Sequence, residues 1–128
     1  MLDINMVSYL IKGHPTVVRH IVATPMSSLH ISVITHCEVL LGLAKRPDAK
    51  RLHLAVKEFL RRVEVLALDS AVAEQYGILR AAMESKGEML APLDLLIAAH
   101  ALSVGAVLVS NDTAFGQVKN LVIENWTD

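Results

Sequence analysis

Residues 92–112 read PLDLLIAAHALSVGAVLVSND, and this stretch decides the fold class. Pro92 suits the first turn of a helix, which we expect to cover residues 93–103 and to be closed by Gly105. The run that follows, residues 105–109, is almost wholly apolar, as in a central parallel strand that is covered on both faces. The stretch therefore predicts a helix followed by a buried parallel strand.

The same alternation of helices and short strands continues on both sides of this stretch. Helical spacing of apolar residues, together with caps and breaks, predicts helices over residues 5–12, 15–23, 35–44, 48–62 and 70–85. We expect strands over residues 29–33, 63–66 and 121–123, and a very short first strand, Met1–Leu2. Short strands that alternate with helices predict an α/β fold with a mainly parallel sheet.

Composition indicates one globular domain over residues 1–128. Hydrophobic residues make up 53% of the chain, and the formal net charge is −1, which argues against disorder. The single cysteine, Cys37, excludes an internal disulfide and fits a reducing cytoplasm. We expect neither a membrane span nor a signal peptide, so the high apolar content favours a protein partner or self-association.

Four carboxylates lie beside the apolar segments: Asp3, Glu38, Asp94 and Asp112. Asp3 and Asp112 follow predicted strands, while Glu38 and Asp94 lie in the opening turns of predicted helices. Since the carboxyl ends of parallel strands share one edge of a sheet, the four side chains can converge there. An ionised carboxylate is costly to bury without a partner. The set therefore predicts a site for a hard divalent cation, Mg²⁺ or Mn²⁺, suited to activating a water against a phosphoryl group.

Each acid also has a structural explanation when it is taken alone. Asp94 can stabilise a helix N-terminus, Glu38 can be an ordinary surface residue, and Asp112 can belong to a turn. We interpret Cys37 as a small core residue and not as a nucleophile. The six histidines contain no H-x-x-x-H pair, so we expect structural or surface roles for His14, His20, His30, His36, His53 and His100.

Basic residues gather in the part of the chain that follows Glu38: Lys45, Arg46, Lys50, Arg51, Lys57, Arg61 and Arg62. A solvated helix surface is the default explanation for such a charge run. The alternative is a patch for the RNA backbone, whose contacts give salt-dependent affinity without sequence preference. The sequence leaves both explanations open.

Four segments in order resemble the PIN-domain ribonucleases. The opening MLDIN is similar to their LDTN segment, and SVITHCEVLLG, residues 32–42, is similar to their S-x-x-T-x-x-E helix. APLDLLIAAHA, residues 91–101, matches their P-x-D-x-x-I-A-A-x-A segment, and LVSNDTAF, residues 108–115, resembles their closing motif. The order and spacing resemble the VapC-like toxins of bacterial toxin–antitoxin pairs over nearly the whole chain.

The resemblance implies a PIN-like three-layer sandwich and a Mg²⁺- or Mn²⁺-dependent endoribonuclease, a class whose members include enzymes that cut tRNA. It places Asp3, Glu38 and Asp94 at the three core metal-site acids and Asp112 at the fourth polar position, with Asn111 as its alternative. It also implies a homodimer and a VapB-like antitoxin that silences the toxin and provides the contact with operator DNA.

One departure from the family pattern bears on function. The Thr of LDTN is Ile4 here, which offers no side-chain hydroxyl near the site. The alternative hypothesis is therefore an attenuated or inactive module that acts mainly as antitoxin partner and co-repressor. The closing motif also departs from many relatives, because it reads Asn111–Asp112–Thr113–Ala114–Phe115.

Overall fold

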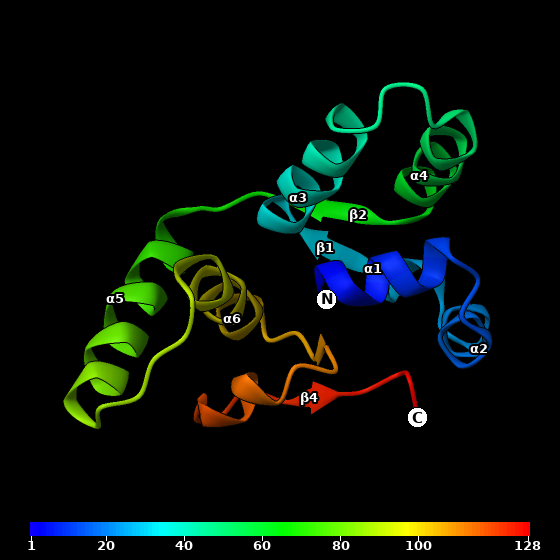
Figure 1. The fold of residues 1–128 in the computed structure, drawn as a ribbon. Coiled ribbons are helices and arrows are strands. Elements are labelled where there is room, and N and C mark those ends of the chain that lie inside the picture. The colour runs from blue at the N-terminus through cyan, green and yellow to red at the C-terminus, as the bar shows by residue number, and fades with distance from the viewer.

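The chain alternates helices with very short strands, as its sequence predicts. A computed structural model describes residues 1–128 (Figure 1). Its helices are α1 (Ile4–Ile11), α2 (Pro15–Ala23), α3 (Val33–Ala44), α4 (Lys50–Arg62), α5 (Ser70–Ser85) and α6 (Pro92–Val104). Its strands are β1 (His30–Ser32), β2 (Glu64–Leu66), β3 (Leu108–Val109) and β4 (Ile123–Glu124), and two 3₁₀ turns are η1 (Met26–Ser28) and η2 (Thr113–Gln117).

The N-terminal residues join two parallel strand pairs into one layer. β1 pairs with β2, and β3 pairs with β4, in parallel register. Between them, Leu2 forms a parallel bridge with Val109, and its N–H donates to the His30 carbonyl at 3.0 Å. The resulting order is β2-β1-Leu2-β3-β4, which places the N-terminus in the middle of the molecule (Figure 1).

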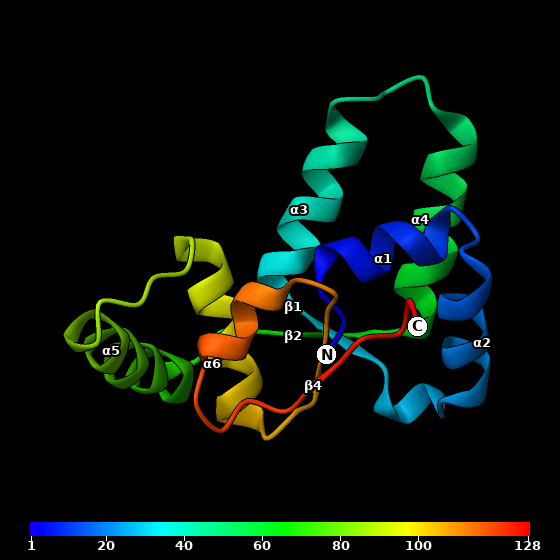
Figure 2. The same cartoon turned by 60° about the horizontal axis from the view of Figure 1, so that its bottom comes forward.

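The two faces of this layer support two hydrophobic cores. Met1 and Leu108 belong to a core formed with α5 and α6, while Leu2 and Val109 belong to a second core formed with α1, α2 and α4. Neighbouring residues of a strand point to opposite faces, so β2 and β3 each serve both cores. Figure 2 shows α5 at one end of the molecule and the α1–α4 group at the other. The predicted three-layer α/β sandwich is thereby confirmed.

Local chemistry explains where several elements begin and end. Ser32 ends β1 and caps α3, because its Oγ accepts the Ile34 N–H at 3.1 Å. α3 therefore starts two residues earlier than predicted. Asp69 caps α5 by accepting the Val72 N–H at 3.1 Å. The helix predicted to start at residue 48 starts two residues later: α4 follows Ala49 and has no side-chain cap, so Asp48 does not cap it.

The predicted strand over residues 105–109 is shorter in the structure. Gly105 adopts a left-handed conformation with φ 67°, and the Ala106 N–H donates back to the Ala101 carbonyl at 2.9 Å. These two residues therefore close α6, as glycine typically does at a helix C-terminus. Only Leu108–Val109 remains as strand, and the final strand lies at Ile123–Glu124.

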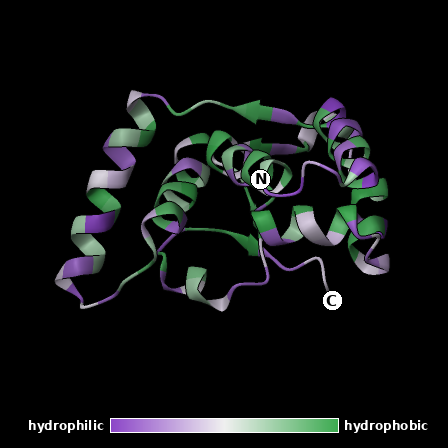
Figure 3. Ribbon diagram, turned by 45° about the horizontal axis from the view of Figure 1, so that its top comes forward, coloured by the Kyte–Doolittle hydropathy of each residue, from purple (hydrophilic) through white to green (hydrophobic).

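One face of α3 is apolar but exposed. Thr35 and Val39 are its buried residues, whereas Leu40 and Leu41 are 46% and 54% exposed. Cys37 is exposed as well, so its interpretation as a core residue is wrong. α3 packs on β1 and α6 with the opposite face, which leaves an apolar stripe uncovered. Figure 3 shows the hydrophobic colouring of the strands and the mixed colouring of α5. None of the helices is long and apolar enough to span a bilayer.

Candidate active site

Asp3 leaves the middle of the sheet and immediately begins α1. Its N–H donates to the Val109 carbonyl at 3.1 Å, and its Oδ1 accepts the Met6 N–H at 2.9 Å as the helix N-cap. The residue is only 5% exposed. The sheet and the first turn of α1 thus hold this carboxylate in one place from two sides.

Asp112 follows the neighbouring strand β3 and lies on the same side of the sheet. Its Oδ1 accepts the Ala114 N–H at 2.9 Å and thereby caps η2. Its own N–H donates to Ser110 Oγ at 3.0 Å. Two local hydrogen bonds therefore fix the turn that presents Asp112.

The remaining two acids come from helices. Asp94 lies in the first turn of α6, just after Pro92, and Glu38 lies in the middle part of α3. Both side chains are partly exposed. α3 and α6 contact each other, so two helices and two strand ends contribute one acid each.

The pKa shifts indicate that the four carboxylates are electrostatic neighbours. Burial raises the pKa of Asp3, and the charges of Asp112 and Asp94 raise it further, against hydrogen bonds from Ser110 and Met6 that lower it. Burial raises the pKa of Asp94, and the charge of Asp112 adds to that rise. Burial also raises the pKa of Glu38, with contributions from Asp94 and Asp3. Like charges are therefore gathered at one edge of the sheet, where a bound cation would relieve their repulsion.

Ser110 lies at the acidic site, and the sequence did not single it out. It is 2% exposed, its Oγ accepts the Asp112 N–H at 3.0 Å, and its hydroxyl lowers the pKa of Asp3. It thus links the acids of two strand ends. Its position as the first polar residue after β3 was the available signal.

The structure also separates Asn111 from Asp112. The Asn111 side-chain amide donates to the Tyr9 hydroxyl at 3.2 Å, on the outer part of α1. The charge of Asp112, in contrast, acts on both Asp3 and Asp94. Of the two neighbours, Asp112 is the one whose side chain is electrostatically part of the acidic site.

A sequence profile of the PIN domain matches residues 1–121. The chain belongs to the PIN-domain family. It is 34% identical over 128 residues to the tRNA(fMet)-specific endonuclease VapC of Shigella flexneri, covering 99% of this chain and 97% of the relative. The predicted PIN-domain nuclease of the VapC group is thereby confirmed.

Solved structures of PIN-domain proteins have the same fold. VapBC2 from Rickettsia felis bound to a promoter DNA fragment matches with a TM-score of 0.90 and 32% identity, over 98% of this chain and 97% of that one. DNA-bound VapBC from Salmonella typhimurium matches with a TM-score of 0.89 and 35% identity, over 98% and 96%. Both are complexes of a toxin with its antitoxin.

PIN nucleases generally require a divalent metal ion, and the donors at this site suit one. Carboxylate oxygens are the ligands that hard divalent cations prefer. No three His, Cys, Asp or Glu side chains are already arranged as a metal-binding group. Repulsion among the four carboxylates separates them when no cation is bound, and a bound cation would bring them closer.

A groove of about 610 Å³ lies between α1, α3 and α4 and reaches the acidic site at Glu38. Ile4, at the start of α1, lines the same groove. Three cationic residues, Lys12, Arg46 and Arg51, also line it. The remaining lining is mostly apolar. A negatively charged chain lying in this groove would meet the three cations and would end beside Glu38.

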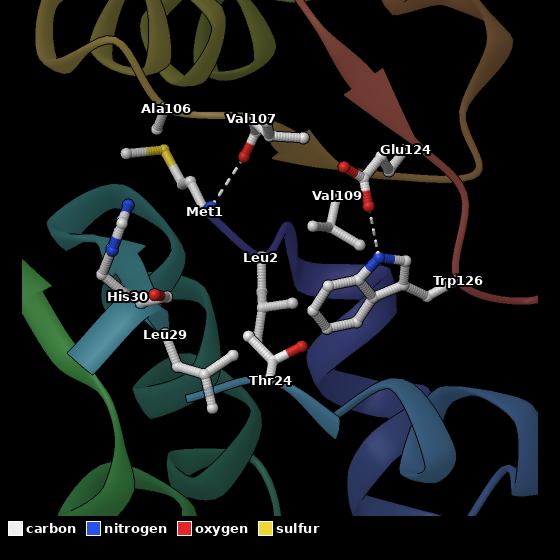
Figure 4. Close-up of a pocket in the computed structure, with 11 residues that line it drawn as sticks. Met1, Leu2, Thr24, Leu29, His30, Ala106, Val107, Val109, Glu124 and Trp126 are labelled. Atoms are coloured by element: carbon white, nitrogen blue, oxygen red, sulfur yellow. Dashed lines mark hydrogen bonds between the residues drawn. The ribbon is translucent and has the colours of Figure 1, made fainter. Parts of the chain in front are cut away.

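A different pocket, of about 340 Å³, lies near the N-terminus (Figure 4). Its lining includes Met1, whose ammonium donates to the Val107 carbonyl at 2.7 Å, and Glu124, which accepts the Trp126 indole N–H at 3.0 Å. None of the four site acids lines this pocket. This pocket is therefore separate from the acidic site.

Proposed function

We propose that this chain is the toxin of a type II toxin–antitoxin pair and that it cuts RNA with the help of Mg²⁺, for which Mn²⁺ can substitute. Asp3, Glu38, Asp94 and Asp112 are the proposed metal-site and catalytic residues. The observation that carries the proposal is the gathering of these four carboxylates at one sheet edge. The charges of Asp112 and Asp94 raise the pKa of Asp3, the charge of Asp112 raises that of Asp94, and the charges of Asp94 and Asp3 raise that of Glu38.

The side chains divide the work by position. Asp3, Asp94 and Asp112 would hold the ion, because their elements meet at the strand ends. Glu38 faces the groove, where its carboxylate can accept a proton from the attacking water. A bound Mg²⁺ supplies charge neutralisation at the phosphate and activation of a water. Attack of that water on phosphorus would break the bond to the 3′ oxygen, which would take a proton from solvent, and would leave a 5′-phosphate and a 3′-hydroxyl.

The groove beside Glu38 supports RNA as the substrate class. Lys12, Arg46 and Arg51 can contact successive phosphates there, which gives affinity that falls with salt. Of the basic cluster that follows Glu38, Arg46 and Arg51 line the groove, and this supports an RNA-contacting role for these two residues. By analogy with the Shigella relative, we propose tRNA as the target, with an initiator tRNA as the first candidate.

The biological setting follows from the same relatives. We propose that a VapB-like antitoxin silences this protein and that operator DNA is contacted only through that antitoxin. We further propose that residues 1–128 form a single PIN domain, that two copies form a homodimer, and that the protein acts in the cytoplasm. The two toxin–antitoxin complexes with DNA support this setting.

Cleavage mapping on a tRNA pool tests the proposed substrate. Purified protein, free of antitoxin, is incubated with Mg²⁺ and either total tRNA or mRNA, and new 5′-phosphate ends are sequenced. We expect a small number of sites, concentrated in one tRNA, that are absent with Asp94→Asn. Uniform cutting of tRNA and mRNA alike would contradict tRNA as the target, and no cutting of any RNA would contradict the ribonuclease.

A further inference from the structure

A buried hydrogen bond joins the two helices that carry Glu38 and Asp94. His100 on α6 is fully buried, and its Nδ1 lies 2.7 Å from Ser32 Oγ, although 68 residues separate the two in sequence. Ser32 is fully buried as well. The mechanism above uses neither residue.

Ser32 is the point at which α3 is anchored to the sheet. It is the last residue of β1 and the N-cap of α3, and the same Oγ that contacts His100 accepts the Ile34 N–H at 3.1 Å. The hydrogen bond to His100 therefore fixes α6 against the origin of α3 and not against a mobile part of it.

The offsets from this bond to the two acids are equal. Glu38 lies six residues after Ser32, and Asp94 lies six residues before His100. At a rise of about 1.5 Å per residue, each acid is roughly 9 Å along its helix from the bond. Because each helix is rigid, a shift of α6 relative to α3 at this hydrogen bond changes the distance between the Glu38 and Asp94 carboxylates.

Burying a histidine here is unfavourable for the fold taken alone. His100 Nε2 has no hydrogen-bond partner, and neither has the buried Thr35 Oγ1 on α3. Burial lowers the pKa of His100, with the charge of Asp69 opposing, so the ring is neutral at neutral pH. His30 is the other titratable group whose charge interacts with it. An apolar side chain of similar size would avoid the unpaired nitrogen, but it would lose the directional bond to Ser32.

We propose that His100 is a positioning residue for the metal site, which through Ser32 sets the distance between the carboxylates of Asp94 and Glu38. The proposal rests on the proposed function, since it assumes that these two acids serve one ion. It predicts that loss of the bond weakens metal binding and slows turnover while leaving RNA binding unchanged.

The test compares His100→Leu, which removes the bond, with His100→Asn, whose side-chain amide can reach Ser32 Oγ from a similar position. Mn²⁺ affinity is measured by calorimetry without RNA, and kcat and KM are measured with RNA. We expect His100→Leu to bind Mn²⁺ about tenfold more weakly and to lose kcat by a similar factor, with KM unchanged. His100→Asn should recover most of both losses.

Ser32→Gly gives a second route to the same bond, because glycine is tolerated at a helix N-cap. It should reproduce the loss of Mn²⁺ affinity, and the double variant Ser32→Gly/His100→Leu should be no worse than either single variant. If His100→Leu does not fold, Ser32→Gly alone decides the matter.

Three results would overturn the proposal. The first is a folded His100→Leu or Ser32→Gly protein that melts at a lower temperature but keeps the wild-type Mn²⁺ affinity and kcat, which would make the bond merely structural. The second is additive losses in the double variant. The third is a wild-type protein that neither binds Mn²⁺ nor cleaves RNA, and this result alone would also remove the proposed function.

Discussion

Asp3 stabilises the fold as a cap and destabilises it as a charge. Its Oδ1 accepts the Met6 N–H, but burial and the charges of Asp112 and Asp94 raise its pKa. The folded state therefore holds a proton on Asp3 more readily than the unfolded chain does. Stability from this group must fall as the pH rises through its raised pKa, because the ionised form is penalised only in the fold.

Asp3→Asn should consequently stabilise the metal-free protein. Asparagine keeps an oxygen for the Met6 N–H and removes the buried charge. We expect a melting temperature several degrees above wild type at neutral pH, with the difference shrinking as the pH falls into the acidic range where Asp3 is protonated. Thermal unfolding in EDTA across pH measures both.

Asp69→Asn is the matched control, since Asp69 caps α5 in the same way but is exposed. It should not change the melting temperature in the same direction. A destabilised Asp3→Asn protein at neutral pH, or a difference that does not vary with pH, would contradict the account of the site as a cluster of strained charges.

Ile4 tests whether the missing hydroxyl matters. The Ser110 hydroxyl already lowers the pKa of Asp3, and Ile4 packs against the second core. We expect Ile4→Thr to alter the rate of RNA cleavage by less than about threefold and to destabilise the fold by about 1 kcal/mol through lost apolar burial. Single-turnover cleavage and urea unfolding measure the two effects. A large gain in cleavage would instead favour the attenuated module.

Sequence predicts residues unequally, for physical reasons. The four acids are identifiable because their positions beside buried segments are visible in the chain. Ser110 is not, because its role depends on a contact with Asp3 across two strands. The error at Cys37 has a similar origin: a helical stripe of apolar residues does not reveal whether the core or a partner covers it.

At the scale of elements, α3 and α4 together form one wall of the groove beside Glu38. Arg51, at the start of α4, lines this wall, whereas Lys57 on the same helix does not. Arg51→Ala should weaken RNA binding several-fold and reduce the slope of log affinity against log salt by about one. Lys57→Ala is the control, and it should leave both values nearly unchanged.

Binding is measured by fluorescence anisotropy over a salt series, with Asp94→Asn as the common background to prevent cleavage. Equal effects of Arg51→Ala and Lys57→Ala would mean that α4 attracts RNA only through its general charge. That result would remove the groove from the proposed path of the RNA.

Element ends show how far sequence rules extend. Where a side chain caps its own helix, as at Ser32 or Asp69, the boundary is a local property. Where a boundary depends on pairing between distant segments, it is not local. The first strand is reduced to a single bridge because Leu2 is held between His30 and Val109, and no local pattern encodes that arrangement.

At the scale of the whole molecule, the exposed apolar stripe of α3 indicates how copies associate. Leu40 and Leu41 are adjacent and about half exposed, next to the exposed Cys37. We expect Leu41→Glu to convert the proposed homodimer to a monomer in size-exclusion chromatography with light scattering. Leu54→Glu on α4, where the leucine is 65% exposed, is the control and should leave the dimer intact.

A monomeric wild type would contradict the homodimer, and a dimer that survives Leu41→Glu would place its interface elsewhere.

The overall architecture could be predicted from the sequence more readily than the dimer interface. Alternating helices and apolar strands predicted the layers, and the opposite faces of Leu108 and Val109 explain why two cores form on one thin sheet.

Metal-dependent cleavage of RNA tests the central claim most directly. Antitoxin-free wild type and Asp94→Asn are compared on the same RNA with Mg²⁺, with Mn²⁺ and with EDTA, after circular dichroism has shown both to be folded. The account predicts cleavage by wild type only when a divalent ion is present, and a loss of more than about a hundredfold in Asp94→Asn. Equal cleavage by the two proteins, or undiminished cleavage in EDTA, would contradict it.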